Sequence, residues 1–458
     1  MRDRVAIVFM TLSVVSTLVL GGAVVHELGR KTSSATLQST GTGTSAAGSD
    51  TSGDTGGIAA SAATPGTPGS AGSTQTVGGT GAVAGAQTKA GTGALSTGST
   101  GVSNGTITVG GIYDETGPFD ATVERDTVKA YFNQVNAAGG VNGYKFQLVD
   151  CDSAYDPTRA HQCSQRLISQ GVLAIVGWLS VSGEQPEADY LNSQGVPMIG
   201  GLGVPSEFSN SLSYPVTTNL TKVGTALGTH AKDLNIHAPG IVVLNANFIK
   251  PVEASLVAAL HKQGITEKSI DEVDPTKADY TDEAIKLRSE GADSVITALD
   301  PFSYARMYQA FDRQNFHPKV LGSGLDKKSA EQQYGSAVYN AESLTPVIEP
   351  DEHTSTPGVS EYYAAVQKYF PGQVSALDVY SEADWVAAKV FVQAVRNVKG
   401  PVSRKTLVDA LNGINNFDTG LTVPISYSPG SSHDPNHCFQ WIQNKQGTWH
   451  TYSDWTCF

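Results

Sequence analysis

Two runs with different hydrophobic periods meet at a glycine turn in the stretch AYFNQVNAAGGVNGYKFQLVDCD, Ala130 to Asp152. Before the turn, Val128, Phe132 and Val135 recur at helical spacing and predict one apolar helix face. Gly139 suits the left-handed conformation that closes a helix, and the Asn-Gly pair after it is typical of a turn. The apolar residues beyond predict a strand buried on both faces. A helix that leads into such a strand is the unit of a parallel α/β sheet.

The same alternation of strands and helices runs on from Thr106, pauses at PVTTNL and then starts again. Strands separated by helices predict parallel sheets with right-handed crossovers, and two successive sets predict two lobes. The predicted strands are ITVGGIY, KFQLVDC, VLAIVGW, VPMIGG, GIVVLNA, SIDEVD, DSVITAL and KVLGSG. The predicted helices are Val123–Ala138, one that begins at Asp156 as N-cap with Pro157 next, Ala188–Ser193, Val252–Gln263, Thr281–Glu290 and Tyr304–Phe316.

The last hundred residues depart from this alternation. Helices are predicted over Val359–Phe370, Ser381–Asn397 and Arg404–Leu411 with no strand between them, and FQWIQNKQGTWHTY predicts a closing hairpin. These late elements must join sheets that are already formed, so we expect the chain to cross between the lobes more than once. Ligand sites in such sheets lie beyond the carboxyl ends of the strands, and facing strand ends would form a cleft.

The N-terminal segment, Met1 to Lys31, predicts export. Its uncharged run Val5–Val25 is long enough to span a bilayer core of about 30 Å. It is longer than the usual signal-peptide core and no A-x-A site follows, so we favour an uncleaved membrane anchor, with a cleaved signal as the alternative. Residues Thr32 to Asn104 are almost entirely Gly, Ser, Thr and Ala, which predicts a disordered tether.

Charge and residue spacing argue against nucleic acid and a metal ion as partners. The 458 residues carry a net charge of −13 without a Lys/Arg cluster, which argues against nucleic acid as a partner. The spacing of Asp150, Asp152 and Asp156 is similar to that of a calcium loop, but the glycine and the distal glutamate are missing, so no metal and no cofactor is expected.

Four cysteines in an exported chain predict two disulfides. Proximity in sequence favours Cys151–Cys163 and Cys438–Cys457. Metal binding is the alternative, although no C-x-x-C occurs and His161 is the only imidazole near the first pair.

Several longer stretches resemble the type I periplasmic binding proteins, in particular the branched-chain amino-acid receptors of ABC importers. The resemblance covers about Gly105 to the C-terminus, and the order of elements agrees throughout. It implies two Rossmann-like lobes joined by a three-strand hinge, with lobe 1 at 105–219 plus 351–423 and lobe 2 at 220–350 plus 424–458. The stretches that carry it are GGIYDETGPF, VNAAGGVNGYKFQLVDCDSAYDPTRA, AIVGWLSVSGEQP, GVPMIGGLGVPSEFS, ADSVITALDPFSYARMYQAF and FQWIQNKQGTW.

The resemblance also implies that loops after the first, third and fourth strands of lobe 1 contact a ligand. Hydroxyl and backbone N–H groups at strand ends and helix N-termini are suited to hold an anion there. Aromatic side chains at the loop ends favour a partly apolar solute, although each could equally pack in the core. The candidate ligand-binding residues are Tyr113, Phe119, Trp178, Ser180, Ser182, Gly201, Leu202, Gly203, Phe248, Asp300, Phe302, Asp326 and Tyr380.

This chain departs from the amino-acid-binding pattern at the positions that hold the ligand's charges. Val181 and Val204 align where those receptors have a Ser and a Thr. The acidic partner of the ligand ammonium aligns at Gly324, with Asp326 two residues away. An aliphatic side chain cannot donate to a carboxylate, so an ordinary branched-chain amino acid is not the expected ligand.

No G-x-S-x-G, H-E-x-x-H or P-loop motif occurs, so we expect a binding protein and not an enzyme. The predicted function is an extracytoplasmic, membrane-anchored receptor that delivers an amino-acid-like, amide or aromatic solute to ABC permease subunits. The alternatives are a ligand-sensing ectodomain and a protein-interaction scaffold at the cell surface.

Overall fold

Two separate β-sheets organise the described part of the chain, which in this computed structural model comprises residues 91–352, 354–430 and 432–458. The predicted anchor Val5–Val25 and the tether up to residue 90 lie outside these residues. Among the helices that the structure describes, none combines the length and the apolar character needed to cross a membrane.

The first sheet has the strand order β3-β2-β4-β5-β6, and β1 pairs antiparallel with the start of β2. All other pairs in this sheet are parallel, as predicted. The strands are β1 (Val102–Ser103), β2 (Thr106–Tyr113), β3 (Lys145–Asp152), β4 (Ile175–Val176), β5 (Met198–Ile199) and β6 (Ser213–Tyr214).

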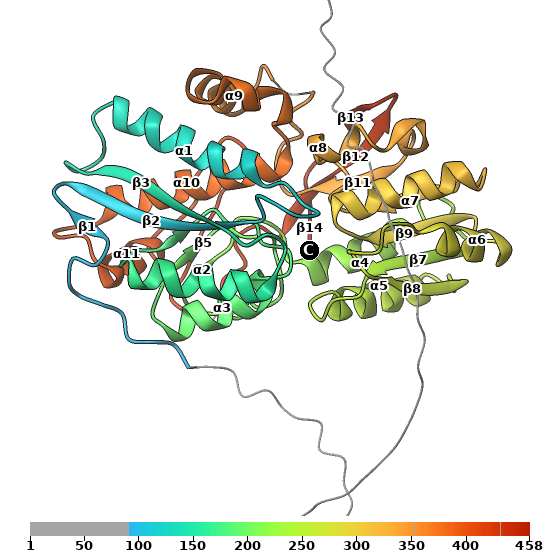
Figure 1. Ribbon diagram of the computed structural model, residues 1–458, viewed down its shortest axis with the longest axis horizontal. Coiled ribbons are helices and arrows are strands. Elements are labelled where there is room, and N and C mark those ends of the chain that lie inside the picture. Colours follow the sequence, from blue (N-terminus) through green and yellow to red (C-terminus); the bar gives the residue numbers. More distant parts are fainter. Residues whose placement is uncertain (1–90, 353, 431) are drawn as a thin grey trace, which may run out of the picture. The chain divides into compact units, whose positions relative to one another are not determined.

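Helices cover both faces of the first sheet because its central strands are apolar on both sides (Figure 1). Ile175 and Met198 face one cluster of buried side chains, whereas the next residues, Val176 and Ile199, face the other. α1 (Thr122–Ala137) packs against α10 (Val379–Asn397), and α2 (Pro157–Ser169) packs against α3 (Glu184–Ser193). The remaining helices of this half are α9 (Pro357–Tyr369), η2 (Pro371–Ala376) and α11 (Arg404–Leu411).

The second sheet has the order β13-β12-β11-β10-β9-β7-β8, with β14 beside β12. Strands β7 to β11 pair in parallel, whereas β12 joins as an antiparallel strand and forms the predicted hairpin with β13. The strands are β7 (Pro239–Leu244), β8 (Ser269–Val273), β9 (Ser294–Ala298), β10 (Lys319–Gly322), β11 (Glu342–Thr345), β12 (Cys438–Lys445), β13 (Thr448–Thr451) and β14 (Thr456–Cys457).

Helices again flank this sheet, with α4 packed on α5 and α6 on α7 (Figure 1). α7 begins at Pro301, three residues before the predicted Tyr304, because the carboxylate of the N-cap residue Asp300 accepts the N–H groups of Phe302 and Ser303. The elements are α4 (Leu220–His230), α5 (Lys250–Lys262), α6 (Thr281–Ser289), α7 (Pro301–Arg313), α8 (Lys328–Glu331) and η1 (Gly335–Val338).

The chain passes between the two halves three times: after β6, after β11 and before β12. Asn436 ties these three segments together. Its side-chain amide donates to the carbonyl of Val216 at 3.0 Å and to that of Pro346 at 2.9 Å. Because Asn436 is fully buried, both hydrogen bonds are shielded from water.

Two local expectations are corrected. The end of the predicted tether, residues 91–104, is ordered: β1 pairs with β2, and the Gly93 N–H donates to the Asn192 carbonyl. Backbone pairing of this kind needs no large side chains, so composition did not reveal it. The strand Lys145–Asp152 is also not buried on both faces. It is the edge strand β3, where Lys145 and Gln147 are exposed.

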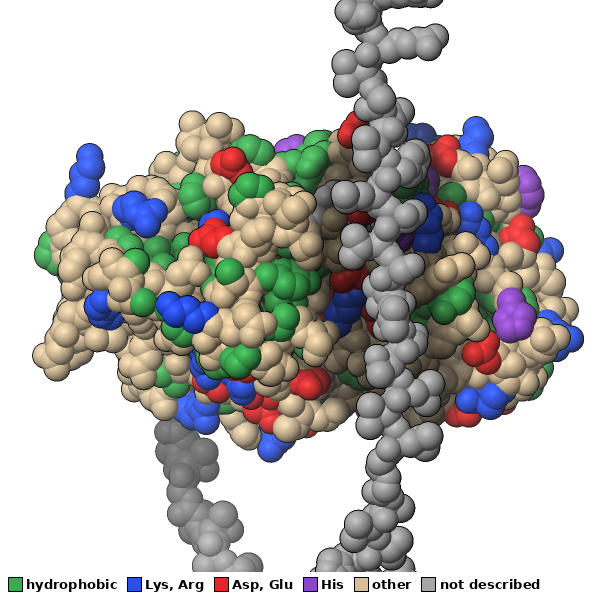
Figure 2. Space-filling view, turned by 90° about the horizontal axis from the view of Figure 1, so that it is seen from above, with side chains coloured by type: hydrophobic (Ala, Val, Ile, Leu, Met, Phe, Trp, Pro, Cys, Tyr) green, Lys and Arg blue, Asp and Glu red, His purple; other side chains and the backbone are tan. Residues whose placement is uncertain are grey.

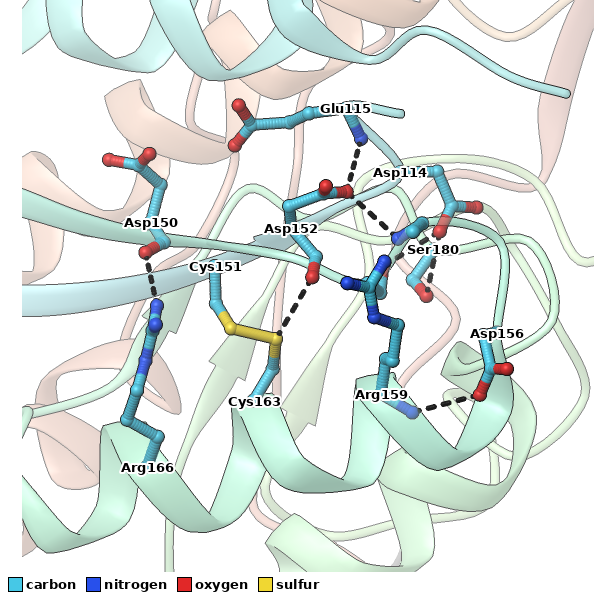
Figure 3. Close-up of a disulfide and its surroundings, with 12 residues drawn as sticks. Asp114, Glu115, Asp150, Cys151, Asp152, Asp156, Arg159, Cys163, Arg166 and Ser180 are labelled. Atoms are coloured by element: carbon cyan, nitrogen blue, oxygen red, sulfur yellow. Dashed lines mark hydrogen bonds between the residues drawn. A yellow bond between two sulfur atoms is a disulfide. The ribbon is translucent and has the colours of Figure 1, made fainter. Parts of the chain in front are cut away.

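Both predicted disulfides are confirmed. Cys151–Cys163 joins β3 to α2 beside a group of acidic side chains (Figure 3), and Cys438–Cys457 joins β12 to β14. On the face drawn in Figure 2, basic and acidic side chains are interspersed across the surface.

Candidate functional site

A cavity of about 130 Å³ lies where the loops of the two sheets meet. Its volume is close to that of an engineered cavity of about 150 Å³ that holds benzene. The first half contributes Phe119, Trp178, Leu179, Val181, Gly201, Leu202, Thr217, Thr218, Val379, Tyr380, Ala383 and Asp384. The second half contributes Leu220, Val223, Leu244, Phe248, Ile249, Val252, Ala298, Leu299, Asp300, Pro301, Ser323, Gly324, Asp326, Leu344 and Pro346.

The position of the cavity follows from the topology. Most of its lining comes directly after the carboxyl ends of β2, β4, β5, β7, β9 and β10, which is where parallel sheets place their loops. The first two turns of α10, the first turn of α4, and residues of β11 and of the segments after β6 and β11 complete it. The walls are aliphatic and aromatic, so the site favours a solute with an apolar body.

Most of the residues predicted to contact a ligand come together in this cavity. Those that line it are Phe119, Trp178, Gly201, Leu202, Phe248, Asp300, Asp326 and Tyr380. Val181, which aligns with a hydroxyl residue in the amino-acid receptors, also lines it. An apolar side chain therefore occupies the place expected for a donor.

The other predicted residues lie elsewhere. Tyr113 is fully buried behind the site, and Gly203 gives its N–H to the Glu207 carboxylate. The Ser182 hydroxyl is buried without a hydrogen-bond partner, but it does not line the cavity. Phe302 packs edge-on against Phe119 and lines a neighbouring cavity of about 360 Å³ instead.

Ser180 is turned towards the protein's own carboxylate. Its hydroxyl lies 3.5 Å from Asp114, and Figure 3 shows the two side chains directed at each other. Asp114 also accepts the Val181 N–H at 2.8 Å, the Tyr155 N–H at 2.7 Å and the Ser153 hydroxyl at 2.7 Å. One internal carboxylate, at the end of β2, thus takes up donors at the ends of β3 and β4.

Two more internal carboxylates take up donors after β4 and β5. Glu184 accepts the Ser180 N–H at 3.0 Å and the Leu202 N–H at 2.7 Å, and Glu207 accepts the Gly203 N–H. Both glutamates are fully buried, and the interaction with Glu207 adds to the raised pKa of Glu184. Burial raises the pKa of Glu207 to about 7 and that of Glu184 well above its usual range.

Two carboxyl groups that line the cavity are incompletely hydrogen-bonded. Neither oxygen of Asp326 has a hydrogen-bond partner in the structure, and Asp384 has one oxygen without a partner. Their exposed fractions are 2% and 4%. Burial raises the pKa of both well above the usual range, and for Asp384 the charges of Glu124 and Glu184 add to this effect.

The remaining polar groups of the lining are mostly engaged. The Tyr380 hydroxyl donates to the Gly324 carbonyl, Thr217 to the Gly201 carbonyl and Thr218 to the Cys438 carbonyl. The indole N–H of Trp178 is the exception, because it is buried without a partner.

Sequence reasoning missed Asp384. This residue lies inside α10, where its neighbours Ala383, Trp385 and Val386 are all buried. A carboxylate between apolar neighbours is the signal that marks it, and Glu382 in the same helix carries the same signal, since buried carboxylates require a partner or a function. The aliphatic lining from α4 and α5 carries no comparable signal, because core residues have the same composition.

Comparison with known proteins gives a consistent picture. A family model described as periplasmic binding protein matches residues 106–448. The Leu/Ile/Val-binding protein homolog 3 of Brucella melitensis is 26% identical over 169 residues, which are 35% of this chain and 45% of that protein. The chain thus spans less than half the length of that relative.

Solved structures show the same fold at low identity. A branched-chain amino acid ABC transporter protein from Thermus thermophilus with bound valine superposes with a TM-score of 0.70 and 17% identity, covering 77% of this chain and 97% of that one. A fatty acid ABC transporter substrate-binding protein from Thermomonospora curvata gives a TM-score of 0.68 and 20% identity, covering 78% and 94%. Proteins with this fold therefore carry names that refer to different ligands.

Proposed function

We propose that this chain, which belongs to the periplasmic binding protein family, is a receptor that binds a small solute in the cavity between its two halves. The observation that carries this proposal is the convergence of strand-end loops from both sheets on one apolar cavity with unpaired polar groups. Pockets of this kind, apolar with a few convergent polar groups, are typical of small-molecule sites.

Binding would proceed by closure of two lobes, 105–219 plus 351–423 and 220–350 plus 424–458. The three chain crossings tied by Asn436 are suited to act as the hinge, because they are short and hydrogen-bonded to one another. A solute that contacts both halves would favour the closed form in proportion to the contacts that only this form allows.

The proposed partners are ABC permease subunits, which would recognise the closed form. The proposed location is extracytoplasmic, with attachment to the membrane through Val5–Val25; this part rests on the sequence of that run alone. Fractionation of cells with and without an intact Val5–Val25 run would test it, since loss of the run should release the protein from the membrane fraction.

Thermal unfolding of the full-length protein against a library of small solutes tests the receptor function. A ligand present at about a hundred times its Kd stabilises the folded state by about 2.7 kcal/mol, which is a readily measured rise in Tm. A saturable rise with one solute class supports the proposal. No rise with any small solute would contradict it and favour a protein-interaction scaffold.

A cavity-filling variant makes the same experiment specific for the site. Ala383 lines the cavity, so Ala383→Trp should abolish the solute-dependent rise. Ala138 is exposed at the end of α1, so Ala138→Trp is the matched control and should retain the solute-dependent rise in Tm.

A further inference from the structure

We propose that the cavity selects an apolar solute that carries a cationic amine and no carboxylate. This inference rests on the proposed receptor function and names the solute class of that site. Two observations support it: the charged residues that line the cavity are acidic, and the backbone N–H groups around it already donate to carboxylates of the protein.

The first argument is the charge of the lining. The charged residues that line the cavity are Asp300, Asp326 and Asp384; among the described residues of its lining, none is Lys, Arg or His. Asp300 is satisfied by the first turn of α7. Asp326 and Asp384 remain as carboxyl groups without full hydrogen bonding, one from each half of the molecule.

A cationic amine would complete this arrangement. An ammonium group supplies three N–H donors and a charge opposite to that of the carboxylates. The raised pKa of both groups is consistent with this view, because desolvation by burial is its main cause and outweighs the charges of Lys328 near Asp326 and Lys327 near Asp384. A ligand carboxylate in the same space would add a further buried acid and leave the existing ones unsatisfied.

The second argument is that the protein's own carboxylates occupy the strand-end donors. Asp114 takes the Val181 N–H, and Glu184 takes the Ser180 and Leu202 N–H groups. These are the donors that could hold an external anion at the ends of β4 and β5. A solute carboxylate would have to displace a fully buried side chain to reach them.

The nearby cations do not compensate. Lys327 is fully buried against Glu124 and Asp378 and does not line the cavity. Arg306 lines only the neighbouring cavity, where its guanidinium donates to the Pro275 carbonyl at 2.7 Å and the Ser303 hydroxyl at 2.8 Å. The Trp178 indole N–H, a donor of the lining residues without a partner, carries no charge.

Matched solutes test the inference by isothermal titration calorimetry on the full-length protein. One series is 3-methylbutylamine, leucine, 4-methylpentanoate and 3-methylbutanol, and the other is 2-phenylethylamine, phenylalanine and 3-phenylpropanoate. The expected result is that an amine binds at least about a hundredfold more tightly than the matched amino acid, acid or alcohol, since a site with buried polar groups rejects an analogue that leaves them unpaired.

Variants assign the effect to the two carboxyl groups. Asp326→Asn and Asp384→Asn keep the shape and remove the charge, and each should weaken amine binding at least about tenfold. Neither is expected to unfold the protein, because the groups are incompletely paired as they stand. Asp282, whose side chain is 90% exposed, provides the control Asp282→Asn, which should leave binding unchanged.

The possible outcomes separate the two proposals. If an amino acid, acid or alcohol binds as tightly as its amine, the inference is wrong and the receptor function stands. If both Asn variants bind the amine like the unchanged protein, the inference is also wrong. If no solute in either series or in the thermal library binds, the receptor function fails and the inference falls with it.

Discussion

The Lys327 ammonium lies 3.1 Å from the Asp378 carboxylate, and both side chains are fully buried. The same ammonium contacts Glu124 and lies over the rings of Phe119 and Tyr380. Lys327 follows β10 in the second half, whereas Glu124 lies on α1 and Asp378 caps α10 in the first. This buried ion triad therefore joins the two halves next to the candidate site.

Removal of the Lys327 charge should be strongly destabilising. Lys327→Met leaves two buried carboxyl groups without their cation, and breaking a buried pair typically costs about 3–5 kcal/mol. Urea unfolding at pH 7 measures the loss. The control is Lys405→Met, because Lys405 is half exposed and pairs with the exposed Asp409. Equal stability losses in the two variants would show that the triad does not stabilise the fold.

The Glu184–Glu207 pair should make stability depend on pH. The pKa of Glu207 is raised from 4.5 to about 7. Below about pH 4.5, Glu207 is protonated in both the folded and the unfolded protein, so its contribution to stability is fully present there. As the pH rises, the unfolded state loses its proton first, and the contribution is lost through about pH 7. Glu207 alone should lower the free energy of unfolding by roughly 3 kcal/mol across this window, at 1.36 kcal/mol per pKa unit.

Glu207→Gln isolates this contribution. The glutamine can still hydrogen-bond Glu184 and the Gly203 N–H without titrating, so the variant should show a smaller decrease between pH 4.5 and 7. The residual slope belongs partly to Glu124, whose pKa is also raised to about 7 by burial. Glu290 is exposed, and Glu290→Gln should leave the slope as it is. An unchanged slope in Glu207→Gln would contradict the assignment.

Asn436 should govern the coupling of the three chain crossings. Asn436→Ala removes two buried hydrogen bonds and leaves the carbonyls of Val216 and Pro346 without that donor, at about 1–3 kcal/mol for each unsatisfied group. We expect lower stability and weaker solute binding together. Asn397→Ala, at the exposed end of α10, is the control and should change neither. If the Asn436→Ala protein is destabilised but binds the solute with unchanged affinity, the three crossings do not control binding and the prediction is wrong.

Much of the fold could be predicted because local signals coincide with the final structure. Asp156 and Pro157 begin α2, and the apolar runs around Val176 and Ile241 become central strands. The position of β3 in the sequence was predicted correctly, but its burial on both faces was not. Whether a strand lies at the edge of a sheet depends on the order of all strands, which the local sequence does not reveal.

The site was predicted less completely than the fold. Trp178 and Asp326 could be placed because they follow predicted strands. The contacts of Ser180 with Asp114 and Glu184 could not be predicted, since the sequence does not reveal that these two carboxylates approach the same loop. Asp384 was missed because a charged residue within a helix is usually exposed, and only the packing of α10 buries it.

The most direct measurement of solute binding in the cavity is the indole N–H signal of Trp178 by NMR, with the full-length protein labelled with ¹⁵N in its five tryptophans and the signal assigned with Trp178→Phe. Trp178 lines the cavity and its N–H lacks a partner, whereas Trp455 is not part of the lining. Titration with the solute that raises Tm should shift the Trp178 signal saturably, with the calorimetric Kd, and leave that of Trp455 unchanged. A solute that binds by calorimetry without moving the Trp178 signal would contradict the account.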